Sequence, residues 1–274
     1  MKKKMLTLLL AAVMLLSMLA LTACGPKFND VDAIKANGKL VVYTEAGFAP
    51  YEFVYENEIV GVDIEIMKKV AEKLGVELVV EDVNFDSITG AVKGGKADAG
   101  AAGMTITAER AEEVDFSIPY ASTEQYVIVT ADDTTVTTVE TMVGKTIGVQ
   151  QGTTSDFLVD GLIADGTLAG STLTPYDAPA LAAAALGTKV DAVVTDKLTA
   201  EVIVAANDGA YKTFKLTKAD GSDAAEVEEY GVCVGKGNET LLAVVNEVLE
   251  ELLADGSVAA WEQQYNDLYS MIEE

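Results

Sequence analysis

Strand-like and helix-like segments alternate along the chain from residue 39 onward, and this alternation restricts the possible folds more than any other feature. Residues 39–44 form a strand candidate that contains β-branched residues, and an apolar face at helical spacing follows over 61–74. We expect these to be followed by a strand over 76–81, a short helix capped by Asp86, a strand over 97–102 and a helix starting at Thr107. Such alternation is typical of parallel sheets covered by helices on both faces, so the sequence predicts an α/β fold.

The alternation resumes after a break, which indicates a second α/β unit. Its expected elements are strands over 126–130, 146–149, around 172 and over 190–195, and helices from Thr153 and over 179–186. A strand over 230–234 and helices over 239–253 and 257–266 come last, too few for a third unit. The chain therefore crosses between two lobes and returns. We expect lobe 1 to comprise 38–121 plus 230–274, lobe 2 to comprise 126–217, and the hinge to lie at 122–125 and 218–229.

The N-terminus has the pattern of an export signal. Three lysines, Lys2 to Lys4, precede the uncharged apolar run Met5 to Leu21. The run approaches the ~18 residues of a membrane span, so a retained signal anchor is the alternative. Leu21-Thr22-Ala23-Cys24 resembles a bacterial lipobox, whose cysteine is acylated before cleavage. We expect a signal peptide at 1–23, a lipid on Cys24, a tether at 24–37 and a location on the extracytoplasmic face of the cell membrane.

Charge and composition exclude several classes of function. The chain holds 44 acidic and 19 basic residues, a formal net charge of -25, so it would repel nucleic acid. It contains no histidine, which excludes Ser-His-Asp and Cys-His nucleophiles and His-ligated zinc. Cys24 is expected to carry lipid, which leaves Cys233 without a disulfide partner, as a buried strand residue or a reactive thiol. We expect no metal and no cofactor.

Arg110 is the only arginine of the chain. A guanidinium presents a planar fork of donors that matches a carboxylate in a bidentate way, whereas a lysine ammonium acts as a point charge. Arg110 is therefore a candidate carboxylate clamp. The alternative is a single surface arginine left by drift in composition.

The surroundings of Arg110 resemble a known family. The segments Asp98-Ala-Gly-Ala-Ala-Gly103-Met104-Thr105-Ile106-Thr107-Ala108-Glu109-Arg110 and Asp115-Phe116-Ser117-Ile118-Pro119-Tyr120 are similar to those of the solute-binding protein family 3, the amino-acid-binding components of bacterial ABC importers. The resemblance extends from about 38 to 270. It implies a two-lobed periplasmic-binding-protein fold of the Venus flytrap type, type II, with two hinge-strand crossings. It also implies a binding protein rather than an enzyme.

By this resemblance, Arg110 should hold the α-carboxylate of an amino acid, assisted by the Thr105 hydroxyl and N–H and the backbone of Gly103. Independently, Thr153 and Thr154 precede or begin a helix whose free N–H groups favour an anion, although plain N-capping also accounts for them. Asp196 ends a strand at a sheet edge where open α/β folds bind ligands. It suits an α-ammonium group, unless it only caps the next helix.

Five further positions, among them Gln150 and Thr195 of the second lobe, match family sites around the ligand side chain. The rings of Phe48 and Phe85 should sandwich that side chain, although lone aromatic residues are often core residues. Glu45 should meet its distal end, next to Gln150. An acidic Glu45 weakly favours a polar or cationic ligand, while a solvent-exposed glutamate is the alternative.

We therefore expect a lipid-anchored protein that captures an amino acid and delivers it to an ABC permease. Two alternatives remain. One is a periplasmic dehydratase acting on arogenate or prephenate, with Glu45 as the candidate general acid. The other is the ligand-sensing ectodomain of a separate signalling partner.

Overall fold

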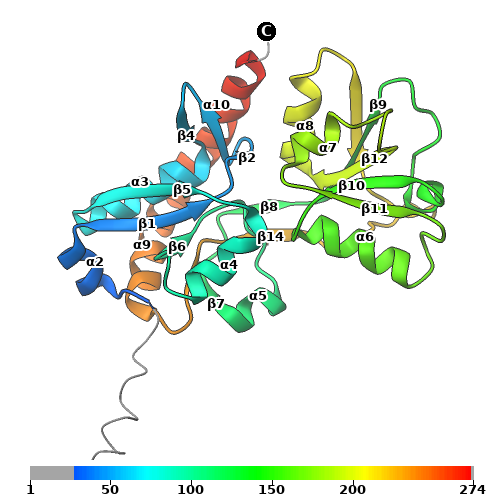
Figure 1. Ribbon diagram of the computed structural model, residues 1–274. Helices are drawn as coiled ribbons and strands as arrows, with labels where there is room; N and C mark the ends of the chain where they lie inside the picture. Colours follow the sequence, from blue (N-terminus) through cyan, green and yellow to red (C-terminus); the bar gives the residue numbers. More distant parts are fainter. Residues whose placement is uncertain (1–27, 273–274) are drawn as a thin grey trace, which may run out of the picture.

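The computed structural model describes residues 28–272, so the expected signal peptide and Cys24 lie outside the described residues. Two α/β lobes lie side by side and are joined by two strands (Figure 1). Each lobe is built on a five-stranded sheet. The family-based expectation of a two-lobed fold is thereby confirmed.

The sheet of lobe 1 has the strand order β5-β1-β6-β15-β7. Its strands are β1 (Lys39–Thr44), β5 (Glu77–Asp82), β6 (Ala99–Gly100), β7 (Val114–Phe116) and β15 (Cys233–Gly235). A small second sheet contains β2 (Gly47–Phe48), β3 (Glu52–Tyr55) and β4 (Glu58–Val60). The helices of this lobe are α2 (Val31–Asn37), α3 (Val62–Leu74), α4 (Phe85–Lys93), α5 (Ala108–Glu113), α9 (Glu239–Ala254) and α10 (Ser257–Ile272).

The sheet of lobe 2 has the order β11-β10-β12-β9-β13. Its strands are β9 (Gln125–Thr130), β10 (Thr146–Gln150), β11 (Thr172–Tyr176), β12 (Ala192–Asp196) and β13 (Tyr211–Lys215). Its helical segments are the 3-10 turn η2 (Val139–Met142) and the helices α6 (Thr154–Ala164), α7 (Pro179–Ala183) and α8 (Lys197–Ala205).

Both sheets are mixed, which corrects the expectation of parallel sheets. In lobe 1, β15 runs antiparallel to β6 and β7. In lobe 2, β9 runs antiparallel to β12 and β13. The reason is connectivity. Each of these strands follows a crossing from the other lobe and enters its sheet against the direction of the neighbouring strands.

The two crossings form a short antiparallel pair, β8 (Ala121–Thr123) with β14 (Glu228–Tyr230). We expected the whole stretch 218–229 in the hinge, but its first part belongs to lobe 2. Thr217 forms an antiparallel bridge with Asp223, and the Ala224 N–H donates to the Leu216 carbonyl at 3.1 Å. This turn packs on the apolar core of lobe 2, so only its last residues reach the hinge.

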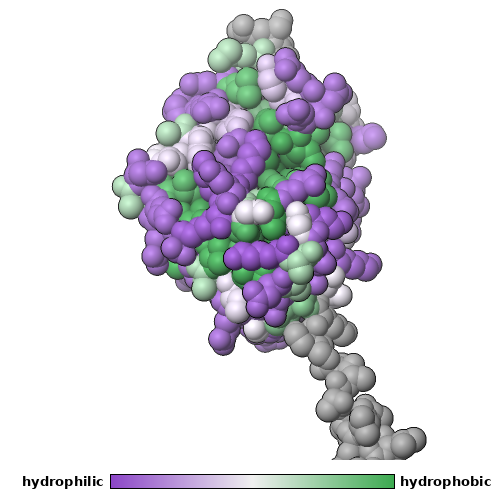
Figure 2. Space-filling model, turned by 90° about the vertical axis from the view of Figure 1, so that its left-hand side faces the viewer, coloured by the Kyte–Doolittle hydropathy of each residue, from purple (hydrophilic) through white to green (hydrophobic). Residues whose placement is uncertain are grey.

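Each lobe buries its own apolar core. In lobe 1, Leu40 and Val42 of β1 pack with Ile66 and Met67 of α3. In lobe 2, alternate residues of β9 and β10 pack with apolar residues of η2 and α6. Cys233 is fully buried, and burial raises the pKa of its thiol to about 12. On the face of lobe 1 turned away from lobe 2, hydrophilic side chains surround smaller hydrophobic areas (Figure 2). Among residues 28–272, no helix is both long and apolar enough to cross a membrane.

The structure confirms one of the expected helix N-termini and contradicts another. The Thr107 hydroxyl accepts a hydrogen bond from the Arg110 N–H at 3.2 Å and caps α5 as expected. Asp86, in contrast, is not a cap, because α4 begins at Phe85 after Asn84. Its carboxylate instead accepts a hydrogen bond at 2.8 Å from Gln151 of the other lobe.

Candidate functional site

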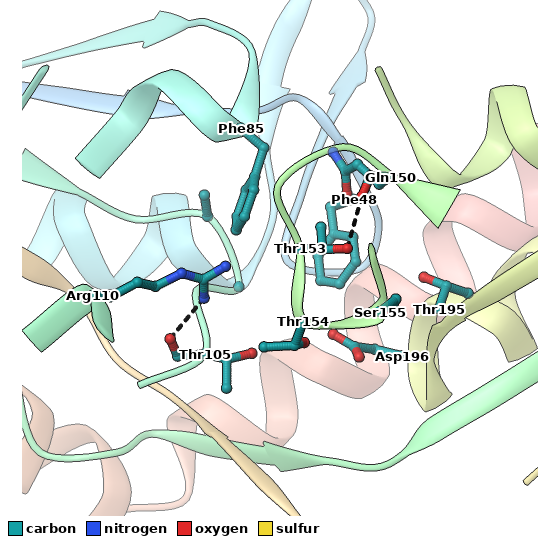
Figure 3. A pocket seen from close by; sticks show the side chains of 12 residues that line it. Phe48, Phe85, Thr105, Arg110, Gln150, Thr153, Thr154, Ser155, Thr195 and Asp196 are labelled. Carbon is teal, nitrogen blue, oxygen red and sulfur yellow. Dashed lines mark hydrogen bonds between the residues drawn. The ribbon is translucent and has the colours of Figure 1, made fainter. Parts of the chain in front are cut away.

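A pocket lies between the lobes, at the carboxyl ends of their central strands (Figure 3). Lobe 1 and lobe 2 each supply six of its lining residues. They are Phe48, Phe85, Ala102, Gly103, Thr105 and Arg110 from lobe 1, and Gln150, Thr153, Thr154, Ser155, Thr195 and Asp196 from lobe 2. The pocket therefore exists only when the lobes face each other.

The guanidinium of Arg110 points into the pocket from one side, near Phe85 and Thr105 (Figure 3). Its two terminal nitrogens donate to the Thr105 carbonyl at 2.7 Å and, across the cleft, to the Gly152 carbonyl at 3.1 Å. The guanidinium carbon lies 5.1 Å from the centre of the Phe85 ring, a cation–π contact. Burial lowers the pKa of Arg110, which nevertheless stays cationic at neutral pH. Arg110 is thus a fixed positive charge inside the pocket rather than a surface residue.

The N-terminus of α6 points into the same pocket. The Thr153 hydroxyl accepts a hydrogen bond from the Asp156 N–H at 3.3 Å, so the capping interpretation is correct for this residue. Thr154 and Ser155 are the first two residues of the helix, and their N–H groups have no intrahelical acceptor. These donors and the positive end of the helix dipole favour an anion beside Arg110.

Asp196 places a carboxylate on the opposite side of the pocket. It precedes α8 but makes no side-chain cap bond to it, so a pure capping role is ruled out. Its two oxygens accept hydrogen bonds from the Gln125 amide at 2.8 Å and from the Tyr230 hydroxyl. Burial, followed by the nearby charge of Glu228, raises the pKa of Asp196 to about 7. A cationic group in the pocket would favour its ionised form.

Glu45 lies just behind the lining residues and is not solvent-exposed. Its carboxylate accepts a hydrogen bond from the Gln150 amide of lobe 2 at 2.7 Å. Burial, together with the nearby carboxylates of Asp82 and Asp177, raises the pKa of Glu45 to about 7. An acidic group therefore stands at the end of the pocket away from Arg110.

Gly103 forms a close contact with Phe48 that no other residue would allow. Its φ is +50°, and a Cβ atom there would lie 2.6 Å from Cε1 of the Phe48 ring. The Gly103 N–H donates to the carboxylate of Asp63 at 2.8 Å, which also accepts from the Tyr120 hydroxyl at 2.8 Å. Burial, followed by the nearby charge of Asp63, raises the pKa of neighbouring Glu52 well above its ordinary value.

The structure brings ten of the eleven expected ligand-site residues to one pocket, and Glu45 contacts the pocket through Gln150. One detail differs. The Thr105 hydroxyl donates to Glu228 at 2.8 Å rather than lying free for a ligand. Sequence reasoning missed the polar residues behind the lining, which are Asp63, Gln125, Glu228 and Tyr230. Only the alternation of Glu228 and Tyr230 along one strand could have indicated a shared face.

Comparison with known proteins now places the chain. The model of the bacterial extracellular solute-binding proteins, family 3, matches residues 40–267. The chain belongs to this family. It is 39% identical to the arginine-binding extracellular protein ArtP of Bacillus subtilis over 150 residues, which cover 55% of this chain and 56% of ArtP.

Two solved structures extend the comparison over most of the chain. The arginine-bound form of truncated ArgBP from T. maritima is 38% identical, with a TM-score of 0.72, and the match covers 81% of this chain and 99% of that one. An ancestral amino-acid-binding protein, AncCDT-1, described as a precursor of cyclohexadienyl dehydratase, is 29% identical, with a TM-score of 0.74 and coverage of 86% and 98%. Members of family 3 are described as solute-binding proteins. The description of AncCDT-1 shows that a protein of this fold can also be the precursor of an enzyme.

The close approach of the lobes at Gly152 gives a first prediction. Gly152 has a φ of +74°, and a Cβ atom there would lie 2.7 Å from Cβ of Asp86 in lobe 1. We expect Gly152→Ala to hold the lobes apart and to raise the radius of gyration in small-angle X-ray scattering. Gly166→Ala is the matched control, because its φ is +87° but no atom lies within 4 Å. Equal radii for the two variants would contradict this steric role.

Proposed function

We propose that this protein captures an amino acid with a cationic side chain, with L-arginine as the first candidate. In this proposal it is anchored through lipid on Cys24 and delivers the ligand to an ABC permease. The observation that carries the proposal is the placement of one guanidinium and one carboxylate in a single interlobe pocket, with a second acid behind it.

The first two charges suit the backbone of a free amino acid. Arg110 and the N-terminus of α6 supply donors for an α-carboxylate, and charge-assisted bonds of this kind contribute about 1.5–3 kcal/mol each. Asp196 supplies the acceptor for an α-ammonium group. Because these groups come from different lobes, a ligand that engages both stabilises the closed arrangement.

The third charge suits a second cation on the ligand. Phe48 and Phe85 provide apolar walls, and Glu45 and Gln150 stand beyond them. A neutral side chain would leave the buried Glu45 without a charge partner, whereas a guanidinium or ammonium would supply one. ArtP and ArgBP, to which this chain is similar, are arginine-binding proteins by name.

The dehydratase alternative is less well supported. It requires a proton donor at a leaving hydroxyl, and Glu45 does not line the pocket and is bonded to Gln150. Membership in a family of solute-binding proteins also favours binding. Failure to convert arogenate in an assay of the purified protein would separate the two functions directly.

The backbone clamp is tested by two substitutions. Arg110→Lys keeps the charge but loses the bidentate fork, so we expect L-arginine affinity to fall at least about tenfold. Asp196→Asn removes the counter-charge of the α-ammonium and should weaken binding by a similar factor. Isothermal titration calorimetry on folded variants measures both. Wild-type affinity in either variant would exclude that residue from the site.

The side-chain preference is tested at Glu45. Since the pKa of Glu45 is raised to about 7 and a ligand cation favours its ionised form, L-arginine affinity should rise with pH from 5.5 to 8.5. Glu45→Gln should weaken L-arginine binding about tenfold or more, remove this carboxyl's share of the pH dependence and leave L-glutamine binding nearly unchanged. Equal losses for both ligands would show that Glu45 does not select for charge.

The anchor is tested at Cys24. Cells expressing the full chain should incorporate an alkyne-labelled fatty acid into the protein and retain it in the membrane fraction, because acyl chains hold it there. Cys24→Ser should lose the label and, because acylation precedes cleavage, should migrate as the larger precursor that still carries residues 1–23, whereas Cys233→Ser, at a buried position, should keep the label and the mature size. A labelled Cys24→Ser variant would place the lipid elsewhere.

A further inference from the structure

Glu228 of the hinge strand β14 is bonded to both lobes. Its carboxylate accepts hydrogen bonds from the Thr105 hydroxyl of lobe 1 at 2.8 Å, from the Thr154 hydroxyl of lobe 2 at 2.7 Å and from the Gln125 amide at 2.9 Å. Neither Thr105 nor Thr154 is near Glu228 in the sequence, since they are 123 and 74 residues away.

The three donors to Glu228 differ in how directly they are tied to the hinge strands. Thr105 is tied to the hinge, because it bridges Tyr230 and the next N–H, that of Ile106, donates to the Glu229 carbonyl at 2.8 Å. Gln125 begins β9 directly after the other hinge strand, so it also lies close to the axis. Thr154 begins α6 in lobe 2 and lies on a different element from the hinge strands. Its hydroxyl donates to Glu228 and also lies 3.5 Å from the Gln125 amide, so this bond depends on how α6 sits over the hinge.

We propose that Glu228 is a positioning residue that latches the closed lobes through Thr154 and thereby aligns the pocket for its ligand. The bonds to Glu228 occupy the hydroxyls of Thr105 and Thr154, the two pocket residues that flank the Arg110 side. The backbone N–H groups of the first turn of α6 are then left to meet a carboxylate together with Arg110. The ligand part of this inference rests on the proposed function, while the latch itself does not.

Glu229 provides a matched control within the same strand. It carries the same charge one residue away, but it is exposed, and alternation along β14 turns its side chain to the opposite face from Glu228. Glu228→Gln and Glu229→Gln therefore change the net charge equally. Only the first removes acceptors from the latch, because an amide has one oxygen and presents its NH₂ group to other donors.

The test combines binding kinetics with scattering. Stopped-flow measurements with L-arginine should show a dissociation rate raised at least about tenfold in Glu228→Gln, with an association rate within about twofold of wild type, because the latch forms after encounter. Glu229→Gln should match wild type. Thr154→Val should reproduce the loss and Thr154→Ser should not. The double variant Glu228→Gln/Thr154→Val should lose less than the product of the single losses, since both remove one contact.

Several outcomes would overturn the latch. An unchanged dissociation rate in folded Glu228→Gln would overturn it, and so would equal dissociation rates in Glu228→Gln and Glu229→Gln. A double variant whose loss equals the product of the two single losses would also overturn it. If Glu228→Gln does not fold, the comparison of dissociation rates between Thr154→Val and Thr154→Ser still tests the latch. If the wild type binds no amino acid, the proposed function fails but the latch is still tested: small-angle scattering should give a larger radius for Thr154→Val than for Thr154→Ser, and equal radii would overturn it.

Discussion

The structure depends on a permanent positive charge held between two lobes. The Arg110 guanidinium cannot lose its proton at neutral pH, and a buried cation without partners is costly. Here it donates to carbonyls of Thr105 and Gly152 and stacks on Phe85. These partners carry only partial negative charge, and a carboxylate would be a stronger one. Thr105 belongs to lobe 1 and Gly152 to lobe 2. The guanidinium that would bind a ligand can therefore make both of these hydrogen bonds only when the two lobes are close together.

The hinge contributes chemistry as well as connectivity. Alternation along β14 turns both Glu228 and Tyr230 toward the cleft, where they meet Thr154 and Asp196 of lobe 2. A strand at the rotation axis moves little, so its side chains can make or break bonds with the moving lobe over short distances. The hinge strand β14 therefore supplies side chains to the hydrogen-bond network of the pocket as well as connecting the lobes.

The sequence predicts the regular elements better than the polar network. Helix α3 and strands β1 and β10 follow from periodicity, and Arg110 and Asp196 follow from residue type together with family resemblance. The capping role of Asp86 was wrong because a local rule cannot foresee a partner such as Gln151 in the other lobe. The expected strand over 97–102 shrinks to Ala99–Gly100, since the chain then leaves the sheet to form the pocket wall at Ala102 and Gly103. Apart from its alternation with Tyr230 along β14, Glu228 has no local signal, because its partners are distant in sequence.

Two buried acids explain how such a pocket can both select and tolerate ligands. Burial raises the pKa values of Asp196 and Glu45 to about 7, so near neutral pH each acid can be neutral or charged at little cost. Every amino acid brings an ammonium for Asp196, but only a cationic side chain brings a partner for Glu45. With a neutral side chain, Glu45 can take up a proton while keeping its bond to Gln150, which avoids an unpaired buried charge. In the proposed function, discrimination between cationic and neutral ligands would therefore depend on the ionisation of Glu45.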